Sequence, residues 1–318
     1  MTETKKIIAV FGATGRQGGG LARAILADPE SEFAVRAITR HPESGPAREL
    51  ERHGAEIVRA DMDDPPSLKA AFAHTYGAYL VTNFWEHMSA EREKAQARAL
   101  AEAAAHAAVQ HAIWSTLEDT RDCIPLDDPR MPTLQGRYKV PHFDGKAEAD
   151  RCFGDEGVPT TFLRTTFYWG NLLGGHSPVR GEDGELWLRY PMGEKRLCGI
   201  AADDIGRVAL AVFRRGTDFI AATISVAGGH LTVADMAAVL TERVGLPVRY
   251  RPLTPDAYRA SGRPAAQEAG NMFQYYADCE HRFVAARDLA AVRGLVPELQ
   301  DFEHWTTVHR DELRSAWS

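Results

Sequence analysis

The sequence has few of the features that mark a specialised class of protein. Only four of its 318 residues are cysteines, and the spacing of Cys123, Cys152, Cys198 and Cys279 fits neither a zinc site nor a dense disulfide framework. We therefore expect reduced structural thiols and no metal site. Charges of one sign form no long run, and 37 basic against 44 acidic residues leave a net charge of −7. This balance argues against nucleic acid as a partner.

Long apolar runs are also missing. The first apolar run, from Ile7 to Phe11, is much shorter than a membrane span or a signal-peptide core, and no later segment reaches the length that a bilayer requires. We therefore expect no membrane association and a cytoplasmic location. Internal repeats and low-complexity tracts are absent as well. With 44% hydrophobic residues, the chain can nevertheless bury a sizeable core.

The first half of the chain alternates short β-branched runs with longer helical patterns, which is typical of successive βαβ units. The predicted fold class is therefore α/β, with a Rossmann-type doubly wound parallel sheet. The expected strands are 7–11, 34–39, 56–59, 78–81, 112–115 and 160–163. The expected helices are 18–27, 67–73, 90–108 and 144–153.

The regular alternation ends after Arg164, where the chain becomes rich in aromatic residues and then in glycine and proline. We expect a first domain over residues 1–165, with residues 199–227 returning to its sheet through a short strand at 223–226. Residues 166–198 and 228–318 are expected to form a smaller, mainly helical C-terminal α/β domain for a substrate, an effector or a partner. Within it, residues 232–244 begin with a Ser/Thr-type cap and read as an amphipathic helix.

A glycine-rich turn joins the first expected strand to the first expected helix. Gly12 lets the chain turn sharply, Gly15 lets backbone amides approach a pyrophosphate, and Gly18 lets the helix pack close to the sheet. The helix N-terminus adds unpaired N–H groups and the positive end of its dipole. Alone, the glycines would indicate only a tight turn, but at this place in a βαβ series they predict a dinucleotide site. The segment reads Gly12-Ala13-Thr14-Gly15-Arg16-Gln17-Gly18.

The end of the second expected strand indicates which dinucleotide is bound. An acidic residue there would favour the free 2′-hydroxyl of NAD(H), but the sequence has Thr39-Arg40-His41. Arg40 supplies a permanent cation that can bind a 2′-phosphate through two hydrogen bonds, and Thr39 can donate another. We see no carboxylate that would compete for Arg40. We therefore predict NADP(H) over NAD(H), the alternative being that Arg40 is only a solvated loop residue.

Four further segments resemble the NmrA-like family of atypical short-chain dehydrogenases, and in particular its NADP(H)-sensing members. The resemblance runs from about Ile7 to the region of Trp305, which is nearly the whole chain. The string from His142 to Lys146 is its most specific part. The segments are Val81-Thr82-Asn83-Phe84-Trp85-Glu86, His142-Phe143-Asp144-Gly145-Lys146, Tyr168-Trp169-Gly170-Asn171-Leu172-Leu173 and Asn271-Met272-Phe273-Gln274-Tyr275-Tyr276-Ala277.

The resemblance implies a set of NADP(H)-binding residues in the loops that follow successive strands. Such loops meet at the carboxyl ends of a parallel sheet, where folds of this kind bind ligands. Each residue alone could have a structural role, such as a cap at Asn83 or core packing at Tyr168. The implied residues are the glycine turn for the phosphates, Thr39, Arg40 and His41 near the 2′-phosphate, Asp61 and Met62 at the adenine, Thr82, Asn83 and Phe84 at the middle, and Lys146, Tyr168, Trp169, Gly170 and Asn171 at the nicotinamide end.

The sequence leaves open whether the protein is an enzyme. Short-chain dehydrogenases use a Ser, a Tyr and a Lys, with the Tyr four residues before the Lys. Here that position is occupied by His142, and the nearby Tyr138 has the wrong helical phase, while Ser115 at the end of the fifth expected strand matches the serine. His142 and Lys146 could each supply a proton. A structural role for His142 and ribose binding by Lys146 are the favoured alternatives.

Two functions of different class therefore remain. The family resemblance implies a protein that senses NADP(H) and changes its contact with a protein partner when the cofactor binds. The second function is an NADPH-dependent reductase that acts on a small molecule, such as a quinone, a carbonyl or an alkene. The missing tyrosine favours the sensor. Neither the partner nor the substrate follows from the sequence, which also leaves a homodimer open.

Overall fold

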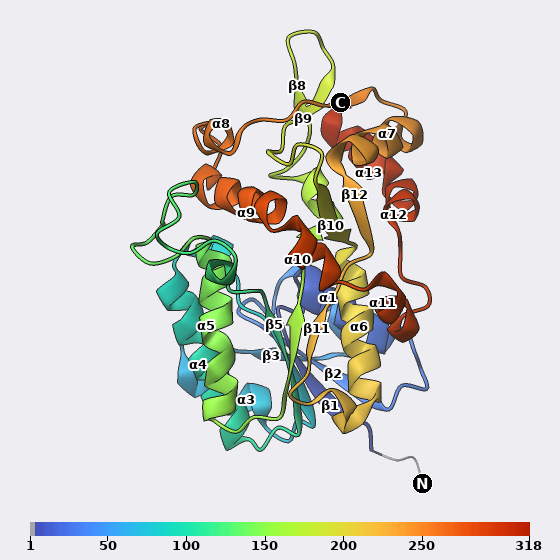
Figure 1. The fold of residues 1–318 in the computed structure, drawn as a ribbon. Coiled ribbons are helices and arrows are strands. Elements are labelled where there is room, and N and C mark those ends of the chain that lie inside the picture. Colours follow the sequence, from blue (N-terminus) through green and yellow to red (C-terminus); the bar gives the residue numbers. More distant parts are fainter. Residues whose placement is uncertain (1–3) are drawn as a thin grey trace. The chain divides into compact units, whose positions relative to one another are not determined.

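The computed structural model describes residues 4–318, which divide into two compact units. Unit 1 contains the chain up to Asp119 together with His142–Thr165 and Ala202–Ile224. Unit 2 contains Thr120–Pro141, Thr166–Ala201 and Ser225–Ser318. No helix within the described residues is long and apolar enough to span a bilayer. Figure 1 shows the helices and strands of both units.

Unit 1 is built on a seven-stranded sheet with the order β11-β6-β5-β4-β1-β2-β3. The pairs from β1 to β6 are parallel, because a helix carries the chain back over the sheet between consecutive strands. The order reverses between β1 and β4, which is the switch point where such folds bind ligands. The strands are β1 (Lys6–Phe11), β2 (Phe33–Thr39), β3 (Glu56–Arg59), β4 (Gly77–Leu80), β5 (His111–Thr116), β6 (Thr160–Arg164) and β11 (Thr223–Ser225).

Helices cover both faces of this sheet (Figure 1). One hydrophobic cluster joins α3, α4 and α5 to the strands through residues such as Leu68, Leu100 and Phe153. On the other face, α1 and α6 touch so closely that a Cβ on Gly206 would lie 2.1 Å from the backbone nitrogen of Leu21. The helices are α1 (Arg16–Leu26), α2 (Gly45–Arg52), α3 (Pro65–Phe72), α4 (Ala90–His106), α5 (Pro141–Asp155) and α6 (Ala202–Arg214), with 3₁₀ turns η1 (Phe84–Glu86) and η4 (Gly216–Phe219).

The structure confirms the predicted Rossmann-type fold. All six expected strands are present with ends within one residue of the prediction, and the expected return strand is β11 at the edge of the sheet. The four expected helices are present as α1, α3, α4 and α5. Helix α2 was not predicted, because its eight residues carry too few apolar positions to show a helical period. Its start is marked by the Ser44 cap and a proline in the first turn.

Unit 2 combines many short helices with two three-stranded sheets, β12-β10-β7 and β13-β9-β8. Helix α7 begins where the sequence predicts, with a capping box formed by Thr232 and Asp235. The short strands were not predicted, since two to five residues show little periodicity. The elements are η2 (Thr120–Asp122), β7 (Phe167–Tyr168), η3 (Trp169–Leu173), β8 (Val179–Arg180), β9 (Leu186–Leu188), β10 (Arg196–Ile200), β12 (Gly229–Thr232), α7 (Val233–Val244), β13 (Val248–Tyr250), α8 (Pro255–Arg259), α9 (Ala266–Asp278), α10 (Glu280–Ala285), α11 (Leu289–Leu295), α12 (Phe302–Val308) and α13 (Arg310–Trp317).

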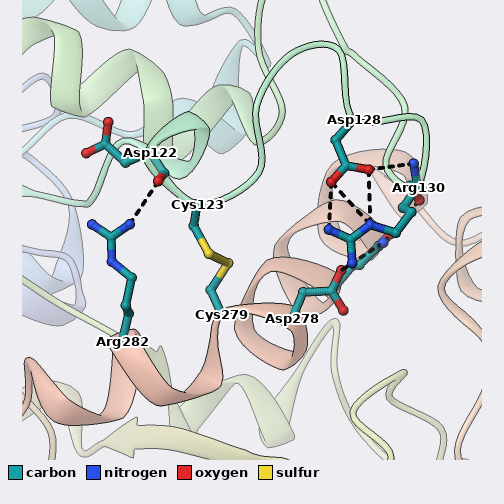
Figure 2. The surroundings of a disulfide bond; sticks show 8 residues. Asp122, Cys123, Asp128, Arg130, Asp278, Cys279 and Arg282 are labelled. Carbon is teal, nitrogen blue, oxygen red and sulfur yellow. Dashed lines mark hydrogen bonds and ion pairs between the residues drawn. A yellow bond between two sulfur atoms is a disulfide. The ribbon is translucent and has the colours of Figure 1, made fainter.

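A disulfide within unit 2 joins Cys123 to Cys279 (Figure 2). The expectation of four reduced thiols is therefore wrong for these two residues, whereas Cys152 and Cys198 form no disulfide and are buried. The bonded cysteines are 156 positions apart, so no local spacing reveals the pair. Beside the bond, the guanidinium of Arg282 donates to the carbonyl oxygen of Asp122 at 2.9 Å. The disulfide thus ties the segment after η2 to the junction of α9 and α10.

The disulfide leads to a testable prediction about stability. Reduction should lower the free energy of unfolding by about 2–4 kcal/mol, because the unfolded chain regains the freedom of a long loop. We expect dithiothreitol to lower the urea midpoint of the wild type but not that of a Cys123→Ser/Cys279→Ser variant. Detection of four free thiols in the denatured, unreduced protein would contradict the bond.

Candidate functional site

The glycine turn has the geometry that a dinucleotide phosphate requires. Gly12 has a φ of 62°, in the left-handed region that favours glycine. A Cβ on Gly18 would lie 2.5 Å from the carbonyl oxygen of Phe11, so only glycine lets α1 start this close to β1. Gly15 caps α1 without a side chain, and the first turn of the helix contains no acidic residue. The turn therefore fits an anion at the positive end of the helix dipole.

Gln17 connects this turn to the centre of the sheet. Its side-chain oxygen accepts hydrogen bonds from the hydroxyls of Tyr79, at 2.5 Å, and Ser115, at 2.8 Å. Ser115 lies on β5 and Tyr79 on β4, so α1 is anchored to the strands on one side of the switch point. The Ser115 hydroxyl thus donates to Gln17, and it is the carbonyl oxygen of Ser115 that lies near Lys146, at 3.4 Å.

Arg40 follows β2 directly, and its side chain is paired with Glu86 of η1 at 2.8 Å. The expectation of no competing carboxylate is therefore wrong, because the fold supplies one from a segment 46 positions away. The side-chain amide of Asn83 donates to the same Glu86 oxygen at 3.0 Å. Partial burial raises the pKa of Glu86, but the hydrogen bonds from Arg40 and Asn83 outweigh it and lower the pKa overall. Thr39 accepts a hydrogen bond from the backbone of His41 at 3.1 Å.

The loop after β3 is fixed by contacts with two helices. The amide of Asp61 donates to Ser67 at 2.9 Å, and Met62 packs against the hydrophobic cluster of unit 1. Asp63, which the sequence did not single out, accepts hydrogen bonds from Arg92 and Gln96 of α4. The bond from Arg92 is the main reason why the pKa of Asp63 is lowered. The loop that contains the two predicted adenine residues is therefore fastened to the start of α4.

Lys146 lies in a buried polar network under the ends of β4 and β5. Its ammonium group donates to the hydroxyl of Thr82 at 2.7 Å and is paired with Glu93 at 2.9 Å. The Thr82 hydroxyl donates in turn to Glu93 at 2.6 Å. The ammonium also lies 4.8 Å from the centre of the Trp114 ring. Glu93 is fully buried and Lys146 is 7% exposed, so this is a desolvated ion pair that needs each of these partners.

Glu93 is the residue of this network that sequence reasoning missed. It lies on the buried face of α4, which it shares with Ala90, Ala97 and Leu100. The sequence did contain a signal for it, because the helical period places this charged residue on an apolar face. The second oxygen of Glu93 lies 3.5 Å from the Nε2 of His87, and both atoms are buried without a hydrogen-bond partner. Lys146, Glu93 and His87 therefore form a continuous row of titratable groups.

His142 lies among aromatic rings. Its ring centre is 4.8 Å from that of Trp85 and 5.7 Å from that of Phe84, and only 6% of the residue is exposed. Phe84 is buried, whereas Trp85 is 46% exposed. This packing gives His142 a structural role in holding η1 against the start of α5.

Four of the five residues predicted at the nicotinamide end belong to unit 2, whereas Lys146 belongs to unit 1. Tyr168 ends β7, and Trp169, Gly170 and Asn171 begin η3. The Trp169 side chain is almost fully buried and packs against the rings of Phe302 and Trp305. The assignment of these residues to the cofactor stays a prediction. Among residues 4–318, no group of three or more His, Cys, Asp or Glu side chains is placed to hold a metal ion.

The glycine turn at the switch point of a doubly wound parallel sheet defines a Rossmann-type nucleotide-binding protein. More specifically, the chain belongs to the NmrA-like family, whose sequence profile matches residues 4–306. This match confirms the resemblance to the NmrA-like family that the sequence motifs indicated.

Several known proteins are similar to this chain over nearly its whole length. The NmrA-like family domain-containing oxidoreductase FrzB of a Cladobotryum species is 28% identical over 302 residues, covering 88% of this chain and 86% of FrzB. NmrA, a negative transcriptional regulator solved in complex with NADP, has a TM-score of 0.78 at 21% identity and covers 99% of this chain and 98% of NmrA. Citrobacter triphenylmethane reductase, complexed with NADP(H), has a TM-score of 0.74 at 19% identity, with coverages of 96% and 99%. The two structures share the fold of this chain.

The buried ion pair allows a prediction about stability. Glu93→Gln keeps an oxygen for Lys146 and Thr82 but leaves the ammonium charge uncompensated, so we expect a loss of about 3 kcal/mol in the free energy of unfolding. The matched control is Glu91→Gln, two residues earlier, because Glu91 is exposed and paired with Lys94 at 2.8 Å. It should cost less than about 1 kcal/mol. Equal losses in the free energy of unfolding, measured by urea denaturation, would show that the buried pair of Glu93 and Lys146 contributes no more to stability than the exposed pair of Glu91 and Lys94.

Proposed function

We propose that this protein binds NADP(H) and acts as a sensor of the cofactor that regulates a protein partner. The glycine turn would hold the pyrophosphate, and Arg40 with Thr39 would bind the 2′-phosphate. Lys146 and Thr82 would lie beneath the part of the cofactor nearest to β4 and β5, where Glu93 fixes the charge of Lys146. The complexes of NmrA with NADP and of triphenylmethane reductase with NADP(H) support NADP(H) as a ligand, and NmrA has also been solved with NAD. A cytoplasmic location is part of the proposal.

The main support for this proposal is that hydrogen-bond acceptors already surround the Lys146 ammonium group. A lysine has three N–H donors, and here Thr82, Glu93 and the carbonyl oxygen of Ser115 surround them. His142 packs between aromatic rings, and no tyrosine stands four residues before Lys146. A group that holds the cofactor by a fixed charge needs no exchangeable proton, whereas a proton donor does. Binding without turnover is therefore the role that this geometry favours.

Regulation would arise from unequal affinity of the cofactor for two conformations. The segments that we expect to differ are residues 165–184 and 87–91. The second follows η1 directly, and η1 is linked to the expected 2′-phosphate site through Glu86 and Arg40. Occupation of that site can thus be transmitted to an exposed part of the surface of unit 1.

The first test concerns the choice of cofactor. Arg40→Ala should weaken NADPH binding about tenfold or more, because it removes charge-assisted hydrogen bonds, and should change NADH binding much less. Affinities can be measured by calorimetry or by quenching of Trp85 fluorescence. Arg48→Ala, which removes an exposed arginine 3.8 Å from Glu43, is the matched control. Equal losses for NADPH and NADH would remove the 2′-phosphate assignment.

A second candidate function is an NADPH-dependent reductase of a quinone, a carbonyl or an alkene. The row of Lys146, Glu93 and His87 favours it, because buried groups in contact can pass a proton toward the surface. FrzB is named an oxidoreductase, and triphenylmethane reductase is an enzyme of similar fold. In this case Lys146 would donate a proton to the reduced substrate and regain it through Glu93.

Turnover separates the two candidates. The sensor should oxidise NADPH no faster than a protein-free control when a panel of quinones and carbonyls is added, as followed by absorbance of the reduced cofactor. A Lys146→Ala/Glu93→Gln variant removes both charges together and so leaves no buried charge unpaired. Turnover in the wild type that disappears in this variant, while NADPH still binds, would establish the reductase instead.

A further inference from the structure

The contact between Glu86 and Arg40 places a carboxylate at a position that decides cofactor preference in Rossmann-type folds. NAD-binding members usually carry an acidic residue at the end of the second strand, where it accepts a hydrogen bond from the ribose 2′-hydroxyl. Here β2 ends with Thr39, and Arg40 follows it. The carboxylate comes instead from η1, where the Glu86 oxygen lies 2.8 Å from the Arg40 guanidinium.

We infer that Glu86 is a specificity-determining residue that opposes NADP(H) and favours NAD(H). It competes with the 2′-phosphate for Arg40, and it presents an acceptor to a free 2′-hydroxyl. The inference rests on the proposed function, since it concerns the same site. It adds a residue with an effect opposite to that of Arg40.

The position of Glu86 is fixed by its own segment rather than by Arg40 alone. Asn83 donates to the same carboxylate oxygen at 3.0 Å. Phe84 is 1% exposed and anchors the turn, and its carbonyl oxygen accepts hydrogen bonds from the backbone of His87 and Met88 at 3.1 and 2.7 Å. The carboxylate therefore stays next to Arg40 even without a strong ion pair. Its lowered pKa keeps it charged at neutral pH.

The exposure of the pair makes exchange with a ligand feasible. The side chains of Arg40 and Glu86 are each 44% exposed, so a ribose can reach both from solvent. An exposed ion pair contributes little to stability, and a phosphate can replace it at small cost. A 2′-phosphate carries more than one negative charge near pH 7 and repels a carboxylate that remains beside Arg40. A 2′-hydroxyl has no charge and can donate to the same carboxylate.

Trp85 supplies a second readout, because it precedes Glu86 in the chain and is 46% exposed. Repulsion by a 2′-phosphate should shift the side chain of Glu86 and alter the surroundings of the adjacent indole ring. A 2′-hydroxyl leaves Glu86 in place and should alter them less. We therefore expect NADPH fragments that carry the 2′-phosphate to change Trp85 fluorescence more than fragments that lack it.

The experiment compares Glu86→Gln with the wild type by calorimetry. Glutamine keeps an oxygen that can accept from Asn83 but removes the charge. The ligands are NADPH, NADH and the fragments 2′,5′-ADP and 5′-AMP, which retain only the adenosine end. The matched control is Glu43→Gln, which removes the same charge. Glu43 is exposed and is paired with Arg48 instead of Arg40.

We expect Glu86→Gln to bind NADPH and 2′,5′-ADP roughly three- to tenfold more tightly, because the competing charge is gone. NADH and 5′-AMP should bind about two- to fivefold more weakly, because an amide oxygen is a poorer acceptor than a carboxylate. In this variant the Trp85 responses to 2′,5′-ADP and 5′-AMP should become similar. Glu43→Gln should change all four affinities by less than about twofold.

Two results would overturn the inference. One is a change in the same direction for the phosphorylated and unphosphorylated ligands, and the other is an effect no larger than that of Glu43→Gln. Thermal midpoints within about 2 °C of the wild type check the fold, and Glu86→Ala provides a second variant if Glu86→Gln is unstable. A wild type that binds neither NADPH nor 2′,5′-ADP would overturn the proposed function together with this inference.

Discussion

The buried ion pair of Lys146 and Glu93 is the contact on which the candidate site depends. It joins α5 to α4, and through Thr82 and the carbonyl oxygen of Ser115 it also reaches the ends of β4 and β5. Desolvation of two charges is expensive, and it is offset here only because the ammonium group meets an acceptor on each side. The same contacts that make the pair tolerable also fix the position of Lys146 beside the ends of β4 and β5. Stability and function are therefore linked through one side chain.

The pair of Arg40 and Glu86 also joins a basic side chain to a glutamate, but its surroundings are different. It is exposed to solvent, so it contributes little to the fold and can exchange with a ligand. The buried pair holds the strands and helices of the site in place, and the exposed pair offers a position where a ligand can compete. The proposed sensor function requires both a rigid frame and one contact that the cofactor can break.

The main features of unit 1 were predictable because they depend on local pattern. Short β-branched runs separated by helical periods identified β1 to β6, and the glycine turn identified the start of α1, where a dinucleotide site is predicted. Helix α2 and the short strands of unit 2 gave no such signal, because elements of two to eight residues contain too few repeats of a period. The Thr232 cap of α7 was readable, since it needs only residues that are adjacent in the chain.

Contacts between distant segments could not be inferred in the same way. Glu86 meets Arg40 across 46 positions, and Cys279 meets Cys123 across 156, so both pairs exist only because the fold brings their segments together. The chain alone determined the Rossmann-type fold class, the glycine turn and the residue types available at the strand ends. Only the tertiary structure decided which charges pair, which of them are buried, and therefore which can respond to a ligand. The reason is that burial and pairing are properties of neighbours in space, whereas periodicity is a property of neighbours in sequence.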